Sequence, residues 1–384
     1  MKFEFQTATR IVFGAGALRE VVPQWREFGF KPFIVSGRDP QRAELLTNLL
    51  ALRSGESVGQ FKVVGEPSIG LSETARMARE TGCDFVISIG GGSVVDAGKA
   101  IASLMTNPGD DLDYVEVVGR GKAITEPPVP FIAIPTTAGT GAEVTRNAVL
   151  SVPEQRVKVS LRSPLMLPRL AIVDPELTYD LPPALTASTG LDALTQLIEP
   201  YVSCRANPMT DALCVEGIRR AARSLRRAVE NGHDKAARED MALASLFSGM
   251  ALANAGLGAV HGFAAPIGGM FDAPHGAVCA VLLPHVMHAN LRALEARAPR
   301  HDALGRYRDV ARLLTGRTSA TADDSVQWAE QLVSHLMLPR LGSYAIKLEH
   351  ATELAAKAAQ ASSMKGNPIA LTADELVAIL RAAL

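Results

Sequence analysis

The chain has 384 residues, of which 39 are lysine or arginine, 40 are aspartate or glutamate and 47% are hydrophobic. One hydrophobic core normally stops growing at about 250–300 residues, so this length predicts two domains. The formal net charge of −1 provides neither a basic surface for nucleic acid nor an acidic tail. We therefore expect no nucleic-acid partner.

The cysteines and the N-terminus indicate a cytoplasmic protein. Four cysteines lie far apart without CxxC spacing, a pattern typical of reduced, buried thiols. The N-terminal MKFEFQTATRIVFGAG has charges where a signal peptide needs an unbroken apolar segment, and no later apolar run is predicted to span a membrane. We expect a soluble protein without a membrane partner, and a homodimer or higher homo-oligomer as the default assembly.

The first half of the chain alternates short β-branched runs with helical patterns, which predicts βαβ units and a mostly parallel sheet. Buried strands are predicted at residues 31–36, 84–89 and 130–134, and helices at residues 39–53 and 72–81. Further strands at residues 148–152, 156–160 and 170–173 are expected to form an antiparallel addition.

The pattern changes near residue 180, where alanine, leucine and arginine begin to recur with helical periodicity. Helices are predicted at residues 207–229, 237–257 and 374–384, among others. Prolines interrupt regular structure within residues 177–183, so we place the boundary there. The predicted domains are an α/β domain over residues 1–180 and an all-helical domain over residues 181–384.

A glycine-rich turn at residues 90–93 follows a predicted strand and precedes a helix predicted at residues 94–105. Glycines allow backbone amides to approach a pyrophosphate, and the start of the helix adds unpaired N–H groups and a positive dipole end. The spacing GGGSxxD differs from the dinucleotide fingerprint GxGxxG. A nucleotide-binding loop and a turn without a ligand both remain compatible with this motif alone.

A second polar loop at residues 135–145, PTTAGTGAEVT, also follows a predicted strand. Its hydroxyl groups come from Thr136, Thr137 and Thr140. Ligands of open α/β sheets bind at the carboxyl ends of strands, where this loop is expected to lie. The alternative is a threonine-rich helix cap without a ligand.

A carboxylate and two histidines in the second half suggest a divalent-metal site. Asp192 and Gln196 are four residues apart and would share one face of a helix. His261 and His275 each stand beside a glycine. Carboxylate and imidazole suit Zn(II) or Fe(II), and three protein ligands leave a position open for substrate. Asp192, His261 and His275 are the predicted catalytic ligands, although each histidine alone is also compatible with an ordinary core or capping role.

Ordered motifs along nearly the whole chain resemble the iron-containing (group III) alcohol dehydrogenase family. They are FGAG at residues 13–16, GGGSVVDAGKA at 90–100, PTTAGTGAEVT at 135–145, DPELT at 174–178, GLDALTQLIEPYVS at 190–203, HGFAAPIGG at 261–269 and APHG at 273–276. The resemblance implies a dehydroquinate synthase-like architecture with an α/β N-terminal dinucleotide-binding domain, an all-helical C-terminal domain and a metal-bearing cleft between them. It also implies an NAD(P)-dependent alcohol dehydrogenase or aldehyde reductase, in which a divalent metal, Fe or Zn, polarises the oxygen of a small alcohol or aldehyde for hydride transfer.

The resemblance also implies roles for individual residues. Asp192, His261 and His275 match three of the four metal ligands of the family. Gly91, Gly92, Ser93 and Asp96 are expected along the pyrophosphate and ribose of NAD or NADP, and further cofactor contacts are expected from Thr136, Thr137, Thr140, Asn147 and Lys158.

Three positions depart from the family pattern. Gln196 stands where the fourth ligand is usually histidine, and its weaker carbonyl donor should lower metal affinity and favour zinc over iron. Ala265 replaces a histidine that often lies near the nicotinamide, which predicts a less polar pocket unsuited to short diols. Gly37, followed by Arg38, replaces an aspartate that repels the 2′-phosphate of NADP, so we expect NADP or dual use.

Three other functions stay open from the sequence. The first is a metal-independent NAD(P)H reductase of the maleylacetate reductase type. The second is a non-redox synthase or lyase on the same fold, which would need more basic residues than Arg146, Lys158 and Arg162 supply. The third is a nucleotide-binding protein without catalysis.

Overall fold

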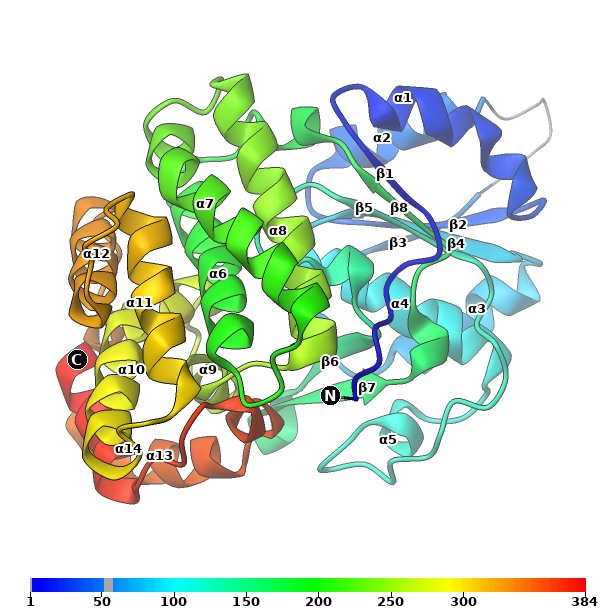
Figure 1. Ribbon diagram of the computed structural model, residues 1–384. Coiled ribbons are helices and arrows are strands. Elements are labelled where there is room, and N and C mark those ends of the chain that lie inside the picture. The colour runs from blue at the N-terminus through cyan, green and yellow to red at the C-terminus, as the bar shows by residue number, and fades with distance from the viewer. Residues whose placement is uncertain (1, 52–57) are drawn as a thin grey trace. The chain divides into compact units, whose positions relative to one another are not determined.

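The computed structural model describes residues 2–51 and 58–384, which form two compact units (Figure 1). An α/β unit comprises Gln6–Thr137 and Gly141–Thr178. A helical unit comprises Tyr179–Leu384, Ala138–Thr140 and the N-terminal residues up to Phe5. The predicted fold class, an α/β N-terminal part followed by a helical C-terminal part, is confirmed.

The α/β unit is built on a parallel sheet with the strand order β1-β8-β5-β4-β2-β3. Its strands are β1 (Ile11–Phe13), β2 (Pro32–Ser36), β3 (Gly59–Lys62), β4 (Phe85–Gly90), β5 (Phe131–Pro135) and β8 (Leu170–Val173). The central strands β2, β4, β5 and β8 are buried along their whole length. Such continuous apolar runs are typical of parallel sheets covered on both faces.

Two apolar cores lie on opposite faces of this sheet because successive strand residues point to alternate sides. Ile34 packs on one face with α1 (Ala17–Val21) and α2 (Pro40–Leu50). Val35 packs on the other face with α3 (Leu71–Glu80) and α4 (Gly92–Thr106). The predicted helix at 39–53 corresponds to α2, with Asp39 as its N-cap, and its predicted last residue, Arg53, lies outside the described residues.

An antiparallel pair, β6 (Asn147–Val152) and β7 (Val157–Arg162), accompanies the parallel sheet. The expectation that residues 170–173 would join this pair is wrong, because β8 pairs in parallel with β1 and β5. The difference follows from burial. β6 alternates between half-buried and buried residues, whereas the apolar run of β8 is buried throughout, as a strand in the interior of a sheet must be. The short strands β1 and β3 were not predicted.

The helical unit contains the nine longer helices of the second half of the described chain. They are α6 (Pro183–Val202), α7 (Pro208–Glu230), α8 (Lys235–Ala255), α9 (Ala259–Met270), α10 (His275–Arg297), α11 (Asp302–Thr315), α12 (Ala322–His335), α13 (Ala351–Gln360) and α14 (Ala373–Ala383). The helices predicted at 207–229, 237–257 and 374–384 are present as α7, α8 and α14. α7 begins with a capping box, in which Asn207 and Thr210 satisfy each other's free backbone amides, followed by Pro208 at its first position.

Helix α10 is the apolar centre of the helical unit. By length and composition it could cross a membrane, but 78% of its apolar window is buried inside the protein. The helices α8 and α9 pass the same test only together, with a bend of 98° between them. Burial of this extent is typical of a core helix.

Candidate metal centre and cofactor loops

Helix α6 presents three polar side chains on one face. Asp192, Gln196 and Glu199 are separated by four and three positions, so they point to the same side of the helix. All three are buried, with exposed fractions of 2%, 3% and 5%. Burial of carboxylates is costly unless they are paired or bind a cation, so the groups that face them decide what this site does.

His261, in the first turn of α9, lies between two of these carboxylates. Its Nδ1 is 2.6 Å from Glu199 Oε2, and its Nε2 is 3.2 Å from Asp192 Oδ1. The backbone N–H of Val260 donates to Glu199 Oε1 at 2.7 Å and holds this carboxylate in place. A proton on Nδ1 that is donated to Glu199 leaves the Nε2 lone pair directed at Asp192, which is the arrangement of a metal-ligating histidine oriented by a carboxylate.

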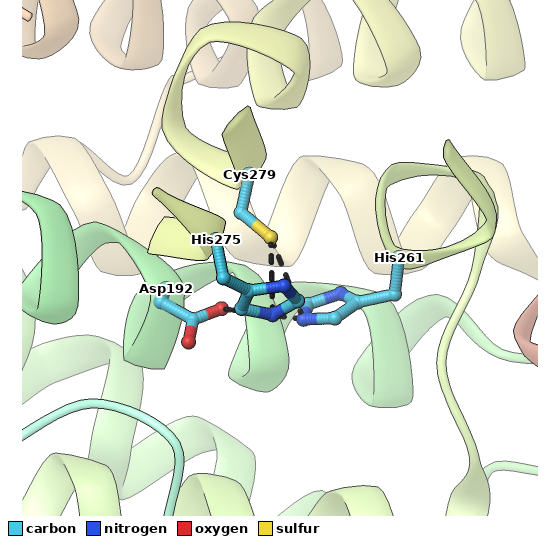
Figure 2. Close-up of side chains that lie close together, drawn as sticks. All are labelled: Asp192, His261, His275 and Cys279. Atoms are coloured by element: carbon cyan, nitrogen blue, oxygen red, sulfur yellow. Dashed lines mark hydrogen bonds and ion pairs between the residues drawn. The ribbon is translucent and has the colours of Figure 1, made fainter. Parts of the chain in front are cut away.

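Helix α10 supplies His275 at its first position and Cys279 one turn later (Figure 2). His275 Nε2 lies 3.7 Å from Asp192 Oδ1. Cys279 Sγ lies 3.6 Å from His275 Nε2 and 3.7 Å from His261 Nε2. Asp192, His261, His275 and Cys279 thus place one donor atom each within 4.8 Å of the others. The structure brings together the three predicted ligands and adds a cysteine.

Gln196 lies one turn after Asp192 but has a different environment. Its Nε2 donates to the carbonyl oxygen of Gly139 at 3.4 Å. Its Oε1 is buried and has no hydrogen-bond partner among the described residues. A buried acceptor without a partner costs about 1–3 kcal/mol, so this oxygen needs a ligand, a water or a cation nearby. The residue is therefore compatible with, but not assigned to, the predicted metal-ligand role.

The charges around the four donors favour a cation. Burial alone would raise the pKa of Asp192, but the neighbouring His275 and His261 more than offset it and the pKa is lowered. Burial would lower the pKa of His261, yet Cys279, Glu199 and Asp192 together raise it well above its usual value. The pKa of His275 is raised in the same way, against burial, by Cys279 and Asp192. Protons held this tightly mark a negative field that a divalent cation would satisfy instead.

Two residues of this site were not predicted from the sequence. Glu199 carried a signal, because it follows Asp192 by seven positions and therefore lies on the same face of a helix. Cys279 carried one as well, because it follows His275 by four positions. The prediction that all cysteines are ordinary buried thiols is thus incomplete, and it is wrong for Cys204, which is exposed. All four cysteines are unpaired, as expected.

The cofactor loops of the α/β unit lie at the carboxyl edge of the sheet. Gly37 follows β2, the turn at Gly91 follows β4, and Thr136 follows β5. The strand order reverses direction between β2 and β4, which are neighbours although β3 comes between them in the chain. Dinucleotides bind outside the carboxyl ends of strands at such a switch point. The glycine-rich turn and the loop after β2 flank this position.

The start of α4 has the features of an anion site. Gly91 is its N-cap, and Gly92 and Ser93 are its first two residues, so their N–H groups are free of helical partners. A Cβ added to Gly91 would meet Thr137 at 3.5 Å, which places this threonine against the turn. Thr136 donates its backbone N–H to Gly90 at 2.9 Å. The structure therefore brings Gly91, Thr136 and Thr137 together.

Asp96, expected to contact the cofactor, is engaged within the α/β unit. Its Oδ2 accepts from the N–H of Val149 at 3.1 Å, and its Oδ1 lies 3.3 Å from Lys99 Nζ. Lys99 also donates to Thr145 Oγ1 at 2.8 Å and to the carbonyl of Asn147 at 2.5 Å. This buried network fixes α4 to the β6 strand. Asp96 thus supports the turn at the start of α4 from one helical turn away.

The other expected cofactor contacts are more scattered. Asn147 starts β6, while Lys158 lies on β7 and pairs with Glu66 at 2.5 Å. In the β6–β7 register Lys158 faces Ser151 and Asn147 faces Arg162, so the two residues lie at different levels of the hairpin. Thr140 belongs to the helical unit rather than the α/β unit. These three residues remain expected contacts from the sequence.

Two positions that depart from the family pattern are both accessible. Ala265 lies on α9, one turn after His261, and is half-buried. Arg38 is exposed beside Gly37 after β2. Asp39 is also near, but its carboxylate caps α2 by accepting from the N–H of Gln41 at 3.0 Å. The aspartate at position 39 is therefore used to start a helix.

Comparison with known proteins gives matches over both units. Residues 8–175 match a family model described as iron-containing alcohol dehydrogenase, and residues 186–384 match one described as Fe-containing alcohol dehydrogenase family, C-terminal. Alcohol dehydrogenase 4 of Schizosaccharomyces pombe is 38% identical over 379 residues, which cover 97% of this chain and 87% of that protein.

Solved structures are similar over the full length. A crystal structure of a 1,3-propanediol oxidoreductase has a TM-score of 0.90 and 34% identity, with 100% of both chains covered. A sulfoacetaldehyde reductase from Bifidobacterium kashiwanohense, solved in complex with NAD+, has a TM-score of 0.86 and 28% identity, covering 100% of this chain and 99% of that one. Sequence and fold therefore point to the same group of proteins.

Proposed function

Because the chain belongs to the iron-containing alcohol dehydrogenase family, and is thereby an NAD-dependent, metal-containing oxidoreductase acting on CH–OH groups, we propose that Asp192, His261 and His275 hold its catalytic cation. The observation that carries the proposal is the convergence of Asp192 Oδ1 with the Nε2 atoms of both histidines, at 3.2 and 3.7 Å. The metal-independent reductase and the non-redox synthase or lyase are not favoured by these relatives.

The donor set fits a divalent cation because it combines a buried carboxylate with two imidazoles, one of them oriented by Glu199. When bound, the cation supplies Lewis-acid chemistry, which lowers the pKa of an alcohol or polarises the carbonyl of an aldehyde. Glu199 keeps the Nδ1 proton of His261 in place, so that the lone pair of Nε2 stays available to bind the cation. Burial of Asp192 and His261 excludes water and strengthens the electrostatic effect of the site on a substrate oxygen.

The nicotinamide cofactor is proposed to bind on the α/β unit with its pyrophosphate at the start of α4. Gly91, Gly92 and Ser93 would supply backbone amides, and Thr136 and Thr137 would supply hydroxyl groups from the adjacent loop. Thr140, Asn147 and Lys158 remain further candidate contacts from the sequence. Asp96 would act indirectly, by fixing α4 to β6.

The metal site is tested with His261→Ala, which removes one donor and its link to Glu199. We expect turnover to be lost, metal content to fall and the dissociation constant for NADH to stay within about twofold, because Gly91, Thr136 and Thr137 belong to the other unit. His335→Ala is the matched control, since His335 is an exposed histidine that pairs with Glu230 on the surface. Full turnover by His261→Ala, or by wild-type protein stripped of metal by a chelator, would contradict the proposal.

We propose that the chain uses NADP as well as NAD, because Gly37 provides no carboxylate against a 2′-phosphate and the exposed Arg38 provides a cation. Gly37→Asp is a suitable test, since a Cβ there would meet only Val94 at 3.5 Å. The ratio of kcat/KM for NADPH to that for NADH should fall by about tenfold, one charge–phosphate contact being worth roughly 1–2 kcal/mol. Arg38→Ala should lower the same ratio by less. A ratio unchanged in both variants would place the adenosine ribose elsewhere.

Alcohols and aldehydes with an apolar chain are the proposed substrates. Ala265 offers no polar group one turn after His261, whereas a hydroxylated substrate such as a short diol would need one. A panel of aldehydes followed at the nicotinamide absorbance should give a higher kcat/KM for hexanal than for 3-hydroxypropanal, and Ala265→His should narrow the difference. A preference for the hydroxylated aldehyde in the wild type would exclude this substrate class.

The chain is further proposed to work in the cytoplasm as a homodimer or higher homo-oligomer. Four unpaired cysteines suit a reducing compartment, and closed symmetric oligomers are the commonest state of such enzymes. Light scattering during size-exclusion chromatography would determine the mass, and a value of 40.7 kDa would identify a monomer and contradict the proposed assembly.

A further inference from the structure

Cys279 is the one donor of the cluster that neither the family pattern nor the sequence prediction assigned. It is fully buried, and its Sγ lies against the Nε2 atoms of both His261 and His275. Its position follows from the helix, because a residue four places after His275 on α10 presents its side chain on the same face. Figure 2 shows the sulfur above the two imidazoles, with Asp192 beside them. We propose that Cys279 Sγ is the fourth protein ligand of the metal and that it biases the site toward Zn(II) over Fe(II).

The distances between donors match those of a tetrahedral zinc site. Bond lengths of about 2.3 Å for Zn–S and about 2.0–2.1 Å for Zn–N and Zn–O, at tetrahedral angles, separate S from N by about 3.6 Å and N from O by about 3.3 Å. The two Sγ–Nε2 distances are 3.6 and 3.7 Å, and the two Nε2–Oδ1 distances are 3.2 and 3.7 Å. These four of the six donor–donor distances agree with a common tetrahedral centre, and all four donor atoms lie within 4.8 Å of one another.

The chemistry of the donors explains the expected preference. Thiolate is a soft ligand that suits zinc, and a cysteine, two histidines and a carboxylate are all ligands that zinc accepts. The negative charge of a thiolate also replaces the donor strength that is lost where the family has a fourth histidine and this chain has Gln196. The amide of Gln196 is held by Gly139 at 3.4 Å through Nε2, which leaves only a neutral carbonyl oxygen as the competing donor. Zinc accepts a fifth ligand in catalytic sites, so four protein donors leave substrate access intact.

The inference rests on the proposed metal site, and spectroscopy of the full chain loaded with Co(II) separates the two. A thiolate bound to Co(II) gives an intense charge-transfer absorption in the near ultraviolet, which a site made only of carboxylate, imidazole and amide lacks. We expect this band in the wild-type protein at one Co(II) per chain. Because the band is measured in the wild type, it does not depend on whether any variant folds.

Variants then identify the sulfur. Cys279→Ser should abolish the band and raise the dissociation constant for Zn(II) by more than about 100-fold, since loss of a group that merely orients a ligand already costs about 10–100-fold. Cys204→Ser is the control, because Cys204 is exposed and bonds to the carbonyl of Lys365, and it should keep both band and affinity. Gln196→Ala should keep the band and change the affinity by less than about tenfold.

Each outcome decides the inference. Two outcomes contradict the assignment of Cys279 as a ligand and leave the proposed function unaffected. One is stoichiometric binding of Co(II) without the absorption band, and the other is a band that persists in Cys279→Ser. Greater metal loss in Gln196→Ala than in Cys279→Ser gives the fourth position to the amide and also overturns it. A wild-type chain that retains no metal overturns both the inference and the metal site beneath it. A higher zinc than iron content in protein grown with equal supplies supports the predicted preference, and the reverse contradicts it.

Discussion

The two units of this chain prepare for their ligands by different means. In the α/β unit the candidate site consists mainly of backbone, with glycines and free amides at the start of α4 beside the loop after β5. In the helical unit the candidate site consists of side chains from α6, α9 and α10 whose donor atoms lie within 4.8 Å of one another. A site formed by backbone amides depends on how closely the helix packs against the sheet and the neighbouring loop. A site formed by side chains depends on which ligand atoms those side chains carry.

Buried acids reveal the same difference. In the α/β unit, burial raises the pKa of Glu143 to about 7, which its own backbone hydrogen bond and the charge of Lys99 only partly offset. In the helical unit, burial of Asp192 is outweighed by two histidines, and its pKa is lowered. Burial therefore favours the neutral form of Glu143, whereas the two histidines favour the charged form of Asp192, as a cation site requires.

Gly98 offers the strongest test of how closely α4 packs against the sheet in the α/β unit. A Cβ at this position on α4 would lie 1.8 Å from Ser88 Oγ and 2.8 Å from Phe131, both on the sheet below. Gly98→Val should lower the free energy of unfolding by about 3 kcal/mol and weaken NADH binding, because α4 must move away from the sheet. Denaturation by urea and NADH fluorescence titration measure the two effects.

The control for this variant comes from the helical unit. Gly305 on α11 is exposed and has nothing within 4 Å of an added Cβ, so Gly305→Ala should raise stability by up to about 1 kcal/mol. If Gly98→Val were tolerated as well as Gly305→Ala, the packing of α4 on the sheet would not set the cofactor turn.

The interior charge of the α/β unit is tested with Glu143→Gln. Since the folded pKa of about 7 exceeds the unfolded value near 4.5, protonation of Glu143 stabilises the fold at low pH, and this stability is lost as the pH rises through about 7. Between pH 5 and pH 8 the wild type should lose about 2 kcal/mol more than the variant in free energy of unfolding. Subtraction cancels the titration of Asp96, which both proteins share, and the difference that remains includes the coupling between Glu143 and Lys99. Parallel pH profiles would mean that Glu143 is ionised in the fold throughout this range.

The smallest effect is expected at Glu199, which touches the helical unit's site without being one of its four donors. Glu199→Gln keeps an acceptor for His261 Nδ1 and removes the negative charge, so metal affinity should fall by about tenfold. NADH binding and thermal stability should change little. Competition with a chromogenic chelator measures the affinity. A loss as large as that of His261→Ala would make Glu199 part of the ligand set.

The sequence predicts the cofactor turn more completely than the metal cluster, because the turn is formed by consecutive residues and the cluster by distant ones. Glycine-rich turns are local, so the segment from Gly90 to Ser93 already contained the strand end, the turn and the helix start that the structure shows. Asp192, His261 and His275 are expected ligands from their residue types, their local sequence context and the family resemblance, and the structure places them within one cluster. The spacing of Cys279 after His275 indicates one imidazole neighbour on the same helix, and the proximity of α9 to α10 adds the second, His261.

Strand pairing is the other feature that local patterns do not determine. Alternation along the chain indicates the hairpin of β6 and β7. The place of β8 depends on contacts between distant segments, because its neighbour β1 ends at Phe13 and its neighbour β5 ends at Pro135. Composition could have indicated it, because Leu170–Val173 is wholly apolar and so requires cover on both faces. Periodicity in the sequence thus predicts the fold class, whereas the pairing of strands that are distant in sequence is known only from the structure.

Every helix that supplies the metal cluster contains an internal proline: Pro200 in α6, Pro266 in α9 and Pro284 in α10. A proline inside a helix removes one rung of the hydrogen-bond ladder and bends the axis near the preceding turn, which is where Gln196, His261 and Cys279 lie. Metal coordination tolerates misplacement of only about 0.5 Å. If this cluster holds the cation, its selectivity depends on helix bends at three prolines that are not ligands, and substitutions of these prolines would change the site without replacing a donor.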